Sequence, residues 1–222
     1  MGIIENLQKI QKQIPSHVTL VAVSKTKPDE MIMEAYQSGH RDFGENKVQD
    51  LAGKAERLPG DIRWHMIGHL QSNKVKYLAS FVHLIHGVDS LKLLNIINKE
   101  GAKHNRVIDC LMQVHIAREQ TKFGFSGDEL QEVLQSDSFG EMKNIRIRGV
   151  MGMATYTENS DQIREEFRHL KRIFEKLRAS LFSNNNSFDQ LSFGMSGDYQ
   201  LAIEEGSTMV RIGSLIFGAR NY

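Results

Sequence analysis

The feature that most limits the possible folds of this chain is a regular alternation of apolar, β-branched runs with segments of helical spacing. A first amphipathic helix over residues 3–14 precedes the alternation. The predicted strands then cover residues 18–24, 41–43, 62–67, 81–88, 106–116, 145–153, 190–193 and 209–212. Strands that alternate with helices imply right-handed βαβ units and a parallel sheet. Eight such units predict an α/β fold of the (β/α)8 TIM-barrel type, with an open doubly wound sheet as the alternative.

The domain organisation follows from the length and from the absence of a dividing segment. The 222 residues suit one large α/β domain, and neither a linker nor a low-complexity tract interrupts the alternation. We therefore expect a single domain over residues 1–222. A long helix is predicted from a cap at Ser160 to Leu181, and a shorter one is predicted to open within Gly68–Lys74 and to reach Leu78.

Charge and cysteine content exclude several classes of function. The 28 Lys and Arg residues nearly balance the 27 Asp and Glu residues, so no global field favours nucleic acid or an anionic membrane. Cys110 is the only cysteine, which rules out an intrachain disulfide framework and suits a reducing compartment. The N-terminus lacks the apolar stretch of a signal peptide, and no run approaches transmembrane length. We expect a cytoplasmic protein that binds neither nucleic acid nor membrane.

The first predicted strand ends in a pair of lysines, within the sequence VTLVAVSKTKP of Val18–Pro28. Lys25 and Lys27 follow the strand directly, at the carboxyl end where α/β folds place their chemistry. Two close lysines and partial burial both lower a lysine pKa, and a neutral amine can form a Schiff base. Two solvated lysines that flank a loop are the alternative interpretation.

Glycine-rich turns follow the seventh and eighth predicted strands, at Gly194–Gly197 and at Gly213-Ser214. TIM barrels commonly bind phosphate with the loops at these two positions. Glycine lets backbone N–H groups approach an anion, and the turn into a helix at Ser196 adds N-terminal amides. Asp198 would oppose a phosphate there, so we expect it to point away. Tight turns without a ligand are the alternative.

Four polar residues at or near strand ends need an explanation. Arg211 lies in the apolar strand MVRIG and requires a carboxylate or a ligand as its partner. His65 is a lone histidine in a strand, which is more typical of a hydrogen-bonded core residue. Asn46 could contact a ligand or cap a helix, and Tyr156 is expected at the surface. No histidine pair combines metal-ligand spacing with a carboxylate, so no metal site is predicted.

A lysine for an aldehyde, a glycine-lined phosphate site and an arginine inside the barrel mouth together fit pyridoxal 5′-phosphate (PLP). The chain also resembles the pyridoxal phosphate homeostasis proteins, the YggS/PROSC family, from Val18 to Tyr222. The motifs that carry the resemblance are AVSKTKP, FGEN, WHMIGHLQSNK, SFGMSGD and GSTMVRIGSLIFGAR. The resemblance implies the PLP-binding barrel that this family shares with alanine racemases.

The resemblance also implies roles for individual residues. The implied cofactor site consists of Lys25, Asn46, His65, Ser196, Arg211, Gly213 and Ser214. Lys25 matches the Schiff-base lysine, and Arg211 matches the arginine that faces the pyridine nitrogen. Ser196, Gly213 and Ser214 match phosphate-binding positions, and Asn46 matches a residue beside the cofactor ring.

His65, Lys27 and Lys74 match the motifs of the family without an assigned role, and a second PLP site at Lys27 or Lys74 is left open. Racemases of this fold resemble two-domain proteins with a C-terminal β-domain, and this chain ends as the barrel closes. We therefore expect no such domain and a monomer.

The function that the resemblance implies is PLP homeostasis. The protein would hold PLP as a Schiff base and buffer or deliver it, with apo PLP-dependent enzymes as recipients and no catalytic residues. One alternative is a minor amino-acid racemase, with Lys25 as one base and Tyr156, Lys27 or His65 as the other. A barrel that binds a phosphorylated sugar or nucleotide without PLP is the second alternative.

Overall fold

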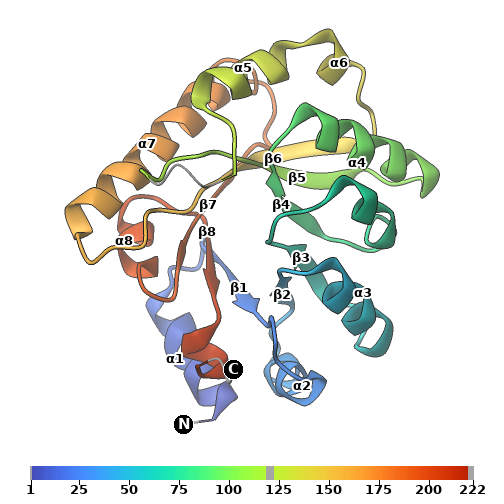
Figure 1. Ribbon diagram of the computed structural model, residues 1–222. Coiled ribbons are helices and arrows are strands. Elements are labelled where there is room, and N and C mark those ends of the chain that lie inside the picture. Colours follow the sequence, from blue (N-terminus) through green and yellow to red (C-terminus); the bar gives the residue numbers. More distant parts are fainter. Residues whose placement is uncertain (1, 119–122, 220–222) are drawn as a thin grey trace.

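Eight parallel strands form a closed barrel in the computed structural model, which describes residues 2–118 and 123–219 (Figure 1). Each strand pairs with the next along the chain, and β8 pairs back with β1. The strands are β1 (Thr19–Val23), β2 (Asp42–Glu45), β3 (Arg63–Met66), β4 (Leu84–Val88), β5 (Ile108–Gln113), β6 (Ile145–Met151), β7 (Gln190–Met195) and β8 (Met209–Ile212). The predicted (β/α)8 barrel is confirmed, and the open sheet is excluded.

The helices surround the barrel, as Figure 1 shows. They are α1 (Ile3–Gln13), α2 (Asp29–Gln37), α3 (Val48–Arg57), α4 (Leu91–Lys103), α5 (Gly127–Gln135), α6 (Asp137–Gly140), α7 (Ser160–Ala179), α8 (Tyr199–Glu204) and α9 (Ser214–Phe217). Between β3 and β4 the chain forms only a short 3-10 helix, η1 (Ser72–Tyr77), whose single buried residue is Val75. The predicted helix reached Leu78, whereas the 3-10 helix in its place ends one residue earlier, at Tyr77.

Two details of the helices differ from the prediction. The cap of α7 is Asn159, whose side chain accepts hydrogen bonds from the backbone N–H groups of Asp161 and Gln162, and Ser160 is the first helical residue. The short helix α6 was not predicted; it begins at Asp137, and the hydroxyl of Ser136, the residue before it, caps it. The difference at α7 is a shift of one residue at a helix boundary, where sequence patterns discriminate poorly.

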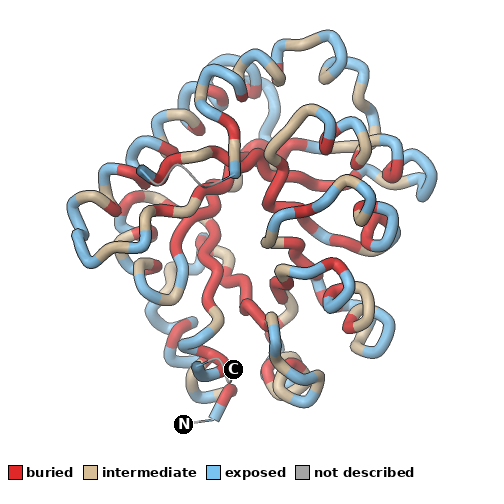
Figure 2. The backbone as a smooth tube through the Cα atoms, in the orientation of Figure 1, coloured by how far each residue is buried: buried red, intermediate tan, exposed pale blue. Residues whose placement is uncertain are grey.

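The apolar core has two parts. The larger part lies between the outer face of the barrel and the helices, and it includes the fully buried Leu7, Ile85 and Phe167. The smaller part fills the inside of the barrel with the side chains of Val21, Leu84, Leu111, Met151 and Met209. Figure 2 shows the buried strands at the centre with the exposed helix faces around them. Because this inner apolar layer is thin, polar side chains occupy the barrel on both sides of it.

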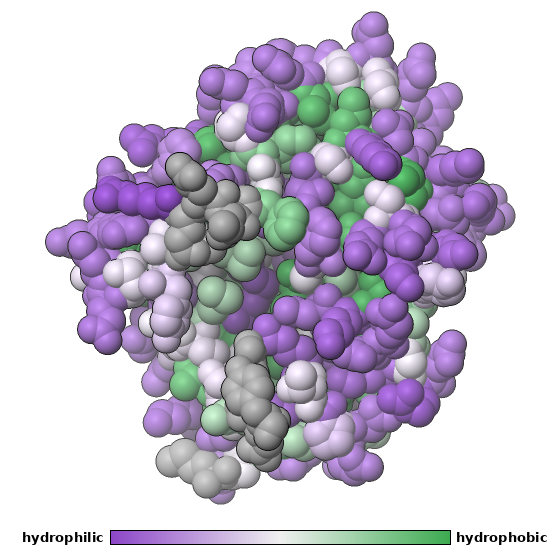
Figure 3. Space-filling view, in the orientation of Figure 1, coloured by the Kyte–Doolittle hydropathy of each residue, from purple (hydrophilic) through white to green (hydrophobic). Residues whose placement is uncertain are grey.

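The surface of the molecule is mostly hydrophilic on the face drawn in Figure 3, with apolar residues showing mainly towards its centre. Within the described part of the chain, none of the helices combines the length and the apolar character that crossing a membrane requires. Cys110 is fully buried in β5, where burial raises the pKa of its thiol. It is therefore a core residue, as its sequence context predicted.

Candidate cofactor site

The carboxyl ends of the strands bring most of the predicted cofactor residues to one end of the barrel. Lys25 follows β1, and Asn46 follows β2. Ser196 follows β7, while Gly213 and Ser214 follow β8. Because all eight strands are parallel, these loops meet at the same rim, where TIM barrels carry their binding sites.

The turn after β7 and the end of β8 are in direct contact. The backbone N–H of Gly213 donates to Ser196 Oγ at 3.3 Å. Asp198 turns its carboxylate back to the backbone N–H of Met195, at 2.5 Å, and so stays engaged within its own turn. The two glycine-containing turns thus form one polar surface that carries the hydroxyls of Ser196 and Ser214.

Arg211 is buried in β8, and only 4% of its surface is exposed. Its guanidinium donates to Ser192 Oγ at 2.6 Å and to the backbone carbonyl of Gly152 at 3.2 Å. Both partners are neutral, and among the described residues no carboxylate forms an ion pair with Arg211. Burial lowers the pKa of Arg211 to about 10, so the group remains cationic at neutral pH. Of the two partners expected for Arg211, the structural carboxylate is therefore absent from this part of the chain.

The strand that precedes Lys25 rests on a buried polar cluster. Ser24 Oγ donates to Glu45 Oε1 at 2.6 Å, and Lys54 Nζ donates to the same oxygen at 2.7 Å and to the backbone carbonyl of Ser24 at 3.0 Å. Burial raises the pKa of Glu45, although the hydrogen bond from Lys54 opposes this shift. The next residue after Lys25, Thr26, has a φ of +64°, in the left-handed region. This cluster fixes the backbone from which Lys25 extends.

Lys27 contacts the last described residues of the chain. Its Nζ donates to the backbone carbonyls of Gly218 and Ala219, at 3.3 and 3.0 Å. Lys27 thus connects the loop after β1 to the segment that follows α9. Lys74 lies in η1, with its Nζ 5.6 Å from the centre of the Tyr77 ring.

Asn46 lies where the ends of β2 and β3 approach each other closely. A Cβ atom on Gly68 would lie 2.4 Å from the backbone oxygen of Asn46, so only glycine fits at this position. Gly68 belongs to the motif that follows β3. The close approach holds the Asn46 backbone at the rim of the barrel.

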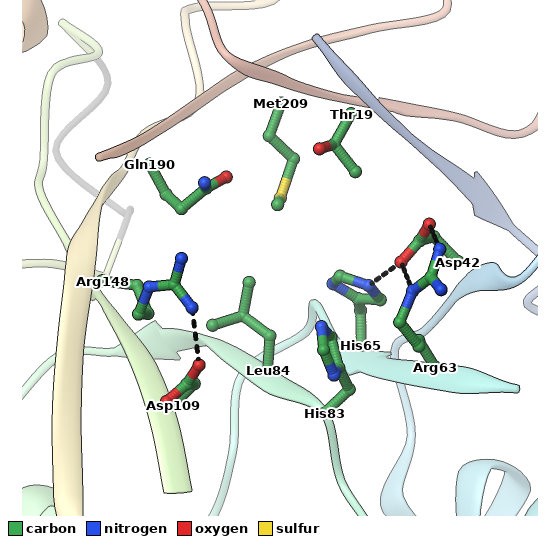
Figure 4. A pocket seen from close by; sticks show the side chains of 10 residues that line it. All are labelled: Thr19, Asp42, Arg63, His65, His83, Leu84, Asp109, Arg148, Gln190 and Met209. Carbon is green, nitrogen blue, oxygen red and sulfur yellow. Dashed lines mark hydrogen bonds and ion pairs between the residues drawn. The ribbon is translucent and has the colours of Figure 1, made fainter. Parts of the chain in front are cut away.

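His65 does not join these residues. It lies in β3 and lines a cavity of about 180 Å³ at the amino ends of the strands, on the other side of the inner apolar layer (Figure 4). The residues that line the cavity are Thr19, Asp42, Arg63, His65, His83, Leu84, Asp109, Arg148, Gln190 and Met209. Arg63 pairs with Asp42, and Arg148 pairs with Asp109, so the two guanidinium groups are largely neutralised.

A hydrogen-bonded chain of side chains runs from this cavity into the barrel. His65 Nε2 lies 3.1 Å from Asp42 Oδ1, and His65 Nδ1 lies 2.9 Å from His86 Nε2. His86 is fully buried, and its Nδ1 has no hydrogen-bond partner among the described residues. Burial lowers the pKa of His86 well below the usual value and that of His83 to about 4. Both imidazoles are therefore neutral at physiological pH.

Several residues of these clusters were missed by the sequence reasoning. Ser192 and Gly152 hold Arg211, and Glu45 and Lys54 support the strand before Lys25. Glu45 and Lys54 come from different elements, so no local motif joins them. His86 had a detectable signal, because it follows the inward-facing Leu84 by two residues in β4 and so shares its face of the strand.

The barrel belongs to a recognised class. The family model described as the alanine racemase N-terminal domain matches residues 2–221. The pyridoxal phosphate homeostasis protein of Aquifex aeolicus is 42% identical over 204 residues, which are 91% of this chain and 87% of that protein. The protein of the same name from Vibrio alginolyticus is 37% identical over 233 residues, which are 98% of this chain and 97% of that protein.

A solved structure agrees with these relatives. PipY of Synechococcus elongatus PCC7942, solved with PLP bound, superposes with a TM-score of 0.88 at 32% identity and covers 98% of this chain and 100% of that one. The chain therefore belongs to the alanine racemase N-terminal domain family and, within it, to the pyridoxal phosphate homeostasis proteins. These relatives are named for homeostasis rather than for a reaction.

Proposed function

We propose that this protein binds PLP at the carboxyl end of the barrel and acts in PLP homeostasis. The observation that carries the proposal is Arg211, a buried cation whose described partners are a hydroxyl and a carbonyl. A buried charge without a carboxylate favours a ligand that supplies an acceptor. The printed names of the relatives and the PLP bound to PipY support the same ligand.

The residues at the rim fit the three functional parts of PLP. Lys25 would hold the aldehyde carbon as a Schiff base, with loss of water, and Arg211 would donate to the pyridine nitrogen. Ser196, Gly213 and Ser214 would bind the phosphate through hydroxyls and backbone N–H groups. Asn46 would lie beside the ring. His65, at the amino end of the barrel, is not included in this site.

The expected role is storage and delivery rather than turnover. PLP supplies an electron sink when it is bound, but an arginine donating to the pyridine nitrogen leaves that nitrogen without a proton and so weakens the sink. Tyr156 is fully exposed, so the structure gives no support to it as a base above the cofactor. We propose that the protein is a cytoplasmic monomer of vitamin B6 metabolism, with apo PLP-dependent enzymes as recipients.

The test of the cofactor is an absorption spectrum of the purified chain with added PLP, before and after borohydride reduction. We expect a band near the visible edge, and after reduction a pyridoxyl group on the peptide that contains Lys25. Lys25→Ala should lose the band, whereas Lys9→Ala, at an exposed position of α1, should retain it. A wild-type chain without the band would contradict PLP binding and leave an anion-binding barrel.

The racemase alternative has its own measurement. A chain that carries PLP and exchanges the Cα hydrogen of an amino acid would incorporate deuterium from D₂O. We expect no incorporation across the common amino acids. Rapid incorporation that Lys25→Ala abolishes would instead make the protein an enzyme.

A further inference from the structure

Three potential metal ligands converge in the cavity at the amino end of the barrel, away from the proposed cofactor site. Asp42 begins β2, His65 lies in β3, and His83 immediately precedes β4. Each offers one ligand atom, and these atoms all lie within 4.8 Å of one another. In Figure 4 the His65 ring lies between the carboxylate of Asp42, to which it is hydrogen-bonded, and the ring of His83.

The surroundings of these residues match those of known metal sites. Metal-ligating histidines usually bond through their second ring nitrogen to a fixed partner, and ligating carboxylates are themselves hydrogen-bonded. His65 meets this condition through His86 Nε2, at 2.9 Å, inside the fully buried part of the barrel. Asp42 meets it through Arg63, whose Nε donates to Oδ1 at 2.7 Å. Each of these two side chains thus has a hydrogen-bond partner that fixes its orientation.

The geometry points to a Zn²⁺ site made of Asp42, His65 and His83. Two imidazoles and one carboxylate suit Zn²⁺, and three protein ligands leave a fourth tetrahedral position for water. Nothing in this site depends on PLP, so its test is separate from that of the proposed function.

Small movements are sufficient to complete the coordination. Zinc bonds to nitrogen and oxygen of about 2.0–2.2 Å place tetrahedral ligand atoms about 3.3–3.5 Å apart. His65 Nε2 and Asp42 Oδ1, at 3.1 Å, are already near this separation. His83 is exposed and precedes its strand, so its ring is the one that can move closer.

Arg63 limits the affinity without closing the site. Its charge repels a cation, and it binds both carboxylate oxygens of Asp42, through Nε to Oδ1 and through Nη2 to Oδ2. Each carboxylate oxygen has two lone pairs, so Asp42 Oδ1 keeps one that Arg63 does not use. This lone pair faces His65 Nε2, whose N–H must be the donor because an ionised carboxylate only accepts. To act as a ligand through Nε2, His65 would carry its proton on Nδ1 instead, where it donates to His86 Nε2.

The site would join three neighbouring strands at the amino end of the barrel. In TIM barrels this end serves stability rather than chemistry. A metal ion that binds only the folded chain raises its stability by mass action. We therefore expect Zn²⁺ to raise the melting temperature.

The experiment uses the full chain without an affinity tag, stripped with EDTA and titrated with Zn²⁺ against a chromophoric chelator. We expect one Zn²⁺ per chain, a higher melting temperature with Zn²⁺, and visible tetrahedral bands when Co²⁺ is used. His83→Gln should weaken binding more than about a hundredfold, since changes to outer-shell partners alone cost 10–100-fold. His169→Gln, at an exposed position of α7, is the matched control and should bind like wild type.

Two results would overturn the assignment. One is a wild-type chain that fails to bind Zn²⁺ stoichiometrically, and the other is equal affinity in wild type and His83→Gln, which would place the metal on surface histidines. Near-ultraviolet circular dichroism of the metal-free variants shows whether each is folded. Retention of the PLP band by His83→Gln would show that the two sites are independent.

Discussion

At the scale of single residues, the most demanding feature is the buried pair of Lys54 and Glu45 beneath the strand that carries Lys25. The ammonium group makes two hydrogen bonds, and the side chains are 8% and 0% exposed. Removing water from two charges is costly, so such a pair adds little net stability. Its stronger effect is to fix the Ser24 carbonyl and hydroxyl, and with them the direction in which Lys25 leaves β1.

Lys54→Met should therefore reduce the free energy of unfolding much more than the loss of a surface lysine does. The variant leaves Glu45 buried without its cation, and we expect the free energy of unfolding to fall by about 3 kcal/mol. The double variant Lys54→Met with Glu45→Gln should recover part of this loss, because the amide is neutral and still accepts from Ser24. Urea unfolding measures the stabilities of the single and the double variant, with Lys12→Met, at an exposed position, as the control. A double variant less stable than the single one would show that the pair is not the cause.

At the scale of elements, ion pairs link α7 to Glu205, the residue that follows α8. Glu205 accepts from Arg168 Nε at 2.8 Å and from a second arginine, Arg164, at 2.9 Å. The hydrogen bond from Arg168 is the main cause that lowers the pKa of Glu205 below its usual value, and Arg164 adds to it. Because two arginines share one carboxylate, this network is firmer than an isolated surface pair.

In the Glu205→Gln variant, the free energy of unfolding should change less with pH in the acid range. At pH 7 we expect the free energy of unfolding to fall by about 1 kcal/mol. The folded-state pKa of Glu205 is lower than the unfolded value near 4.5, so the unfolded chain takes up the proton first as pH falls. The stabilisation is therefore complete above that value and is lost below it. As pH falls below about 4.5, the urea midpoints of wild type and variant should converge, whereas the exposed control Glu132→Gln should follow wild type at every pH.

At the scale of the whole molecule, the first and last helices of the described chain pack against each other. α1 packs against α9 and α2, and Asn6 Nδ2 donates to the backbone carbonyl of Ile216 at 3.2 Å. In Figure 1 the two terminal helices lie side by side below the barrel. Since α9 begins at Ser214, in the proposed phosphate site, the first helix supports a surface formed by the last residues.

Leu7→Ala should reveal this connection. Leu7 is fully buried in α1, and its truncation should cost about 2–5 kcal/mol of unfolding free energy. Leu130→Ala in α5 removes an equally buried side chain, but far along the chain from the phosphate loops. We expect similar losses of stability in urea and a larger loss of PLP affinity for Leu7→Ala. Equal affinities in the two variants would mean that α1 does not support the site.

The sequence by itself determined the barrel, its order of strands and most of the residues at its carboxyl rim. This was possible because strand and helix periods are local, and because parallel strands place every following loop at one end. The glycine turns at 194 and 213 and the lysine after β1 could thus be placed without coordinates.

Only the tertiary structure decided which polar side chains face each other inside the barrel. His65 was expected near the cofactor, but its position in β3 directs it to Asp42 and His83, and 41 positions separate these two. Spacing rules compare residues within one helix or loop, so they could not group Asp42 in β2, His65 in β3 and His83 before β4. The partners of Arg211 were hidden for the same reason, since Ser192 lies in β7 and Gly152 follows β6, both far from Arg211 in the sequence.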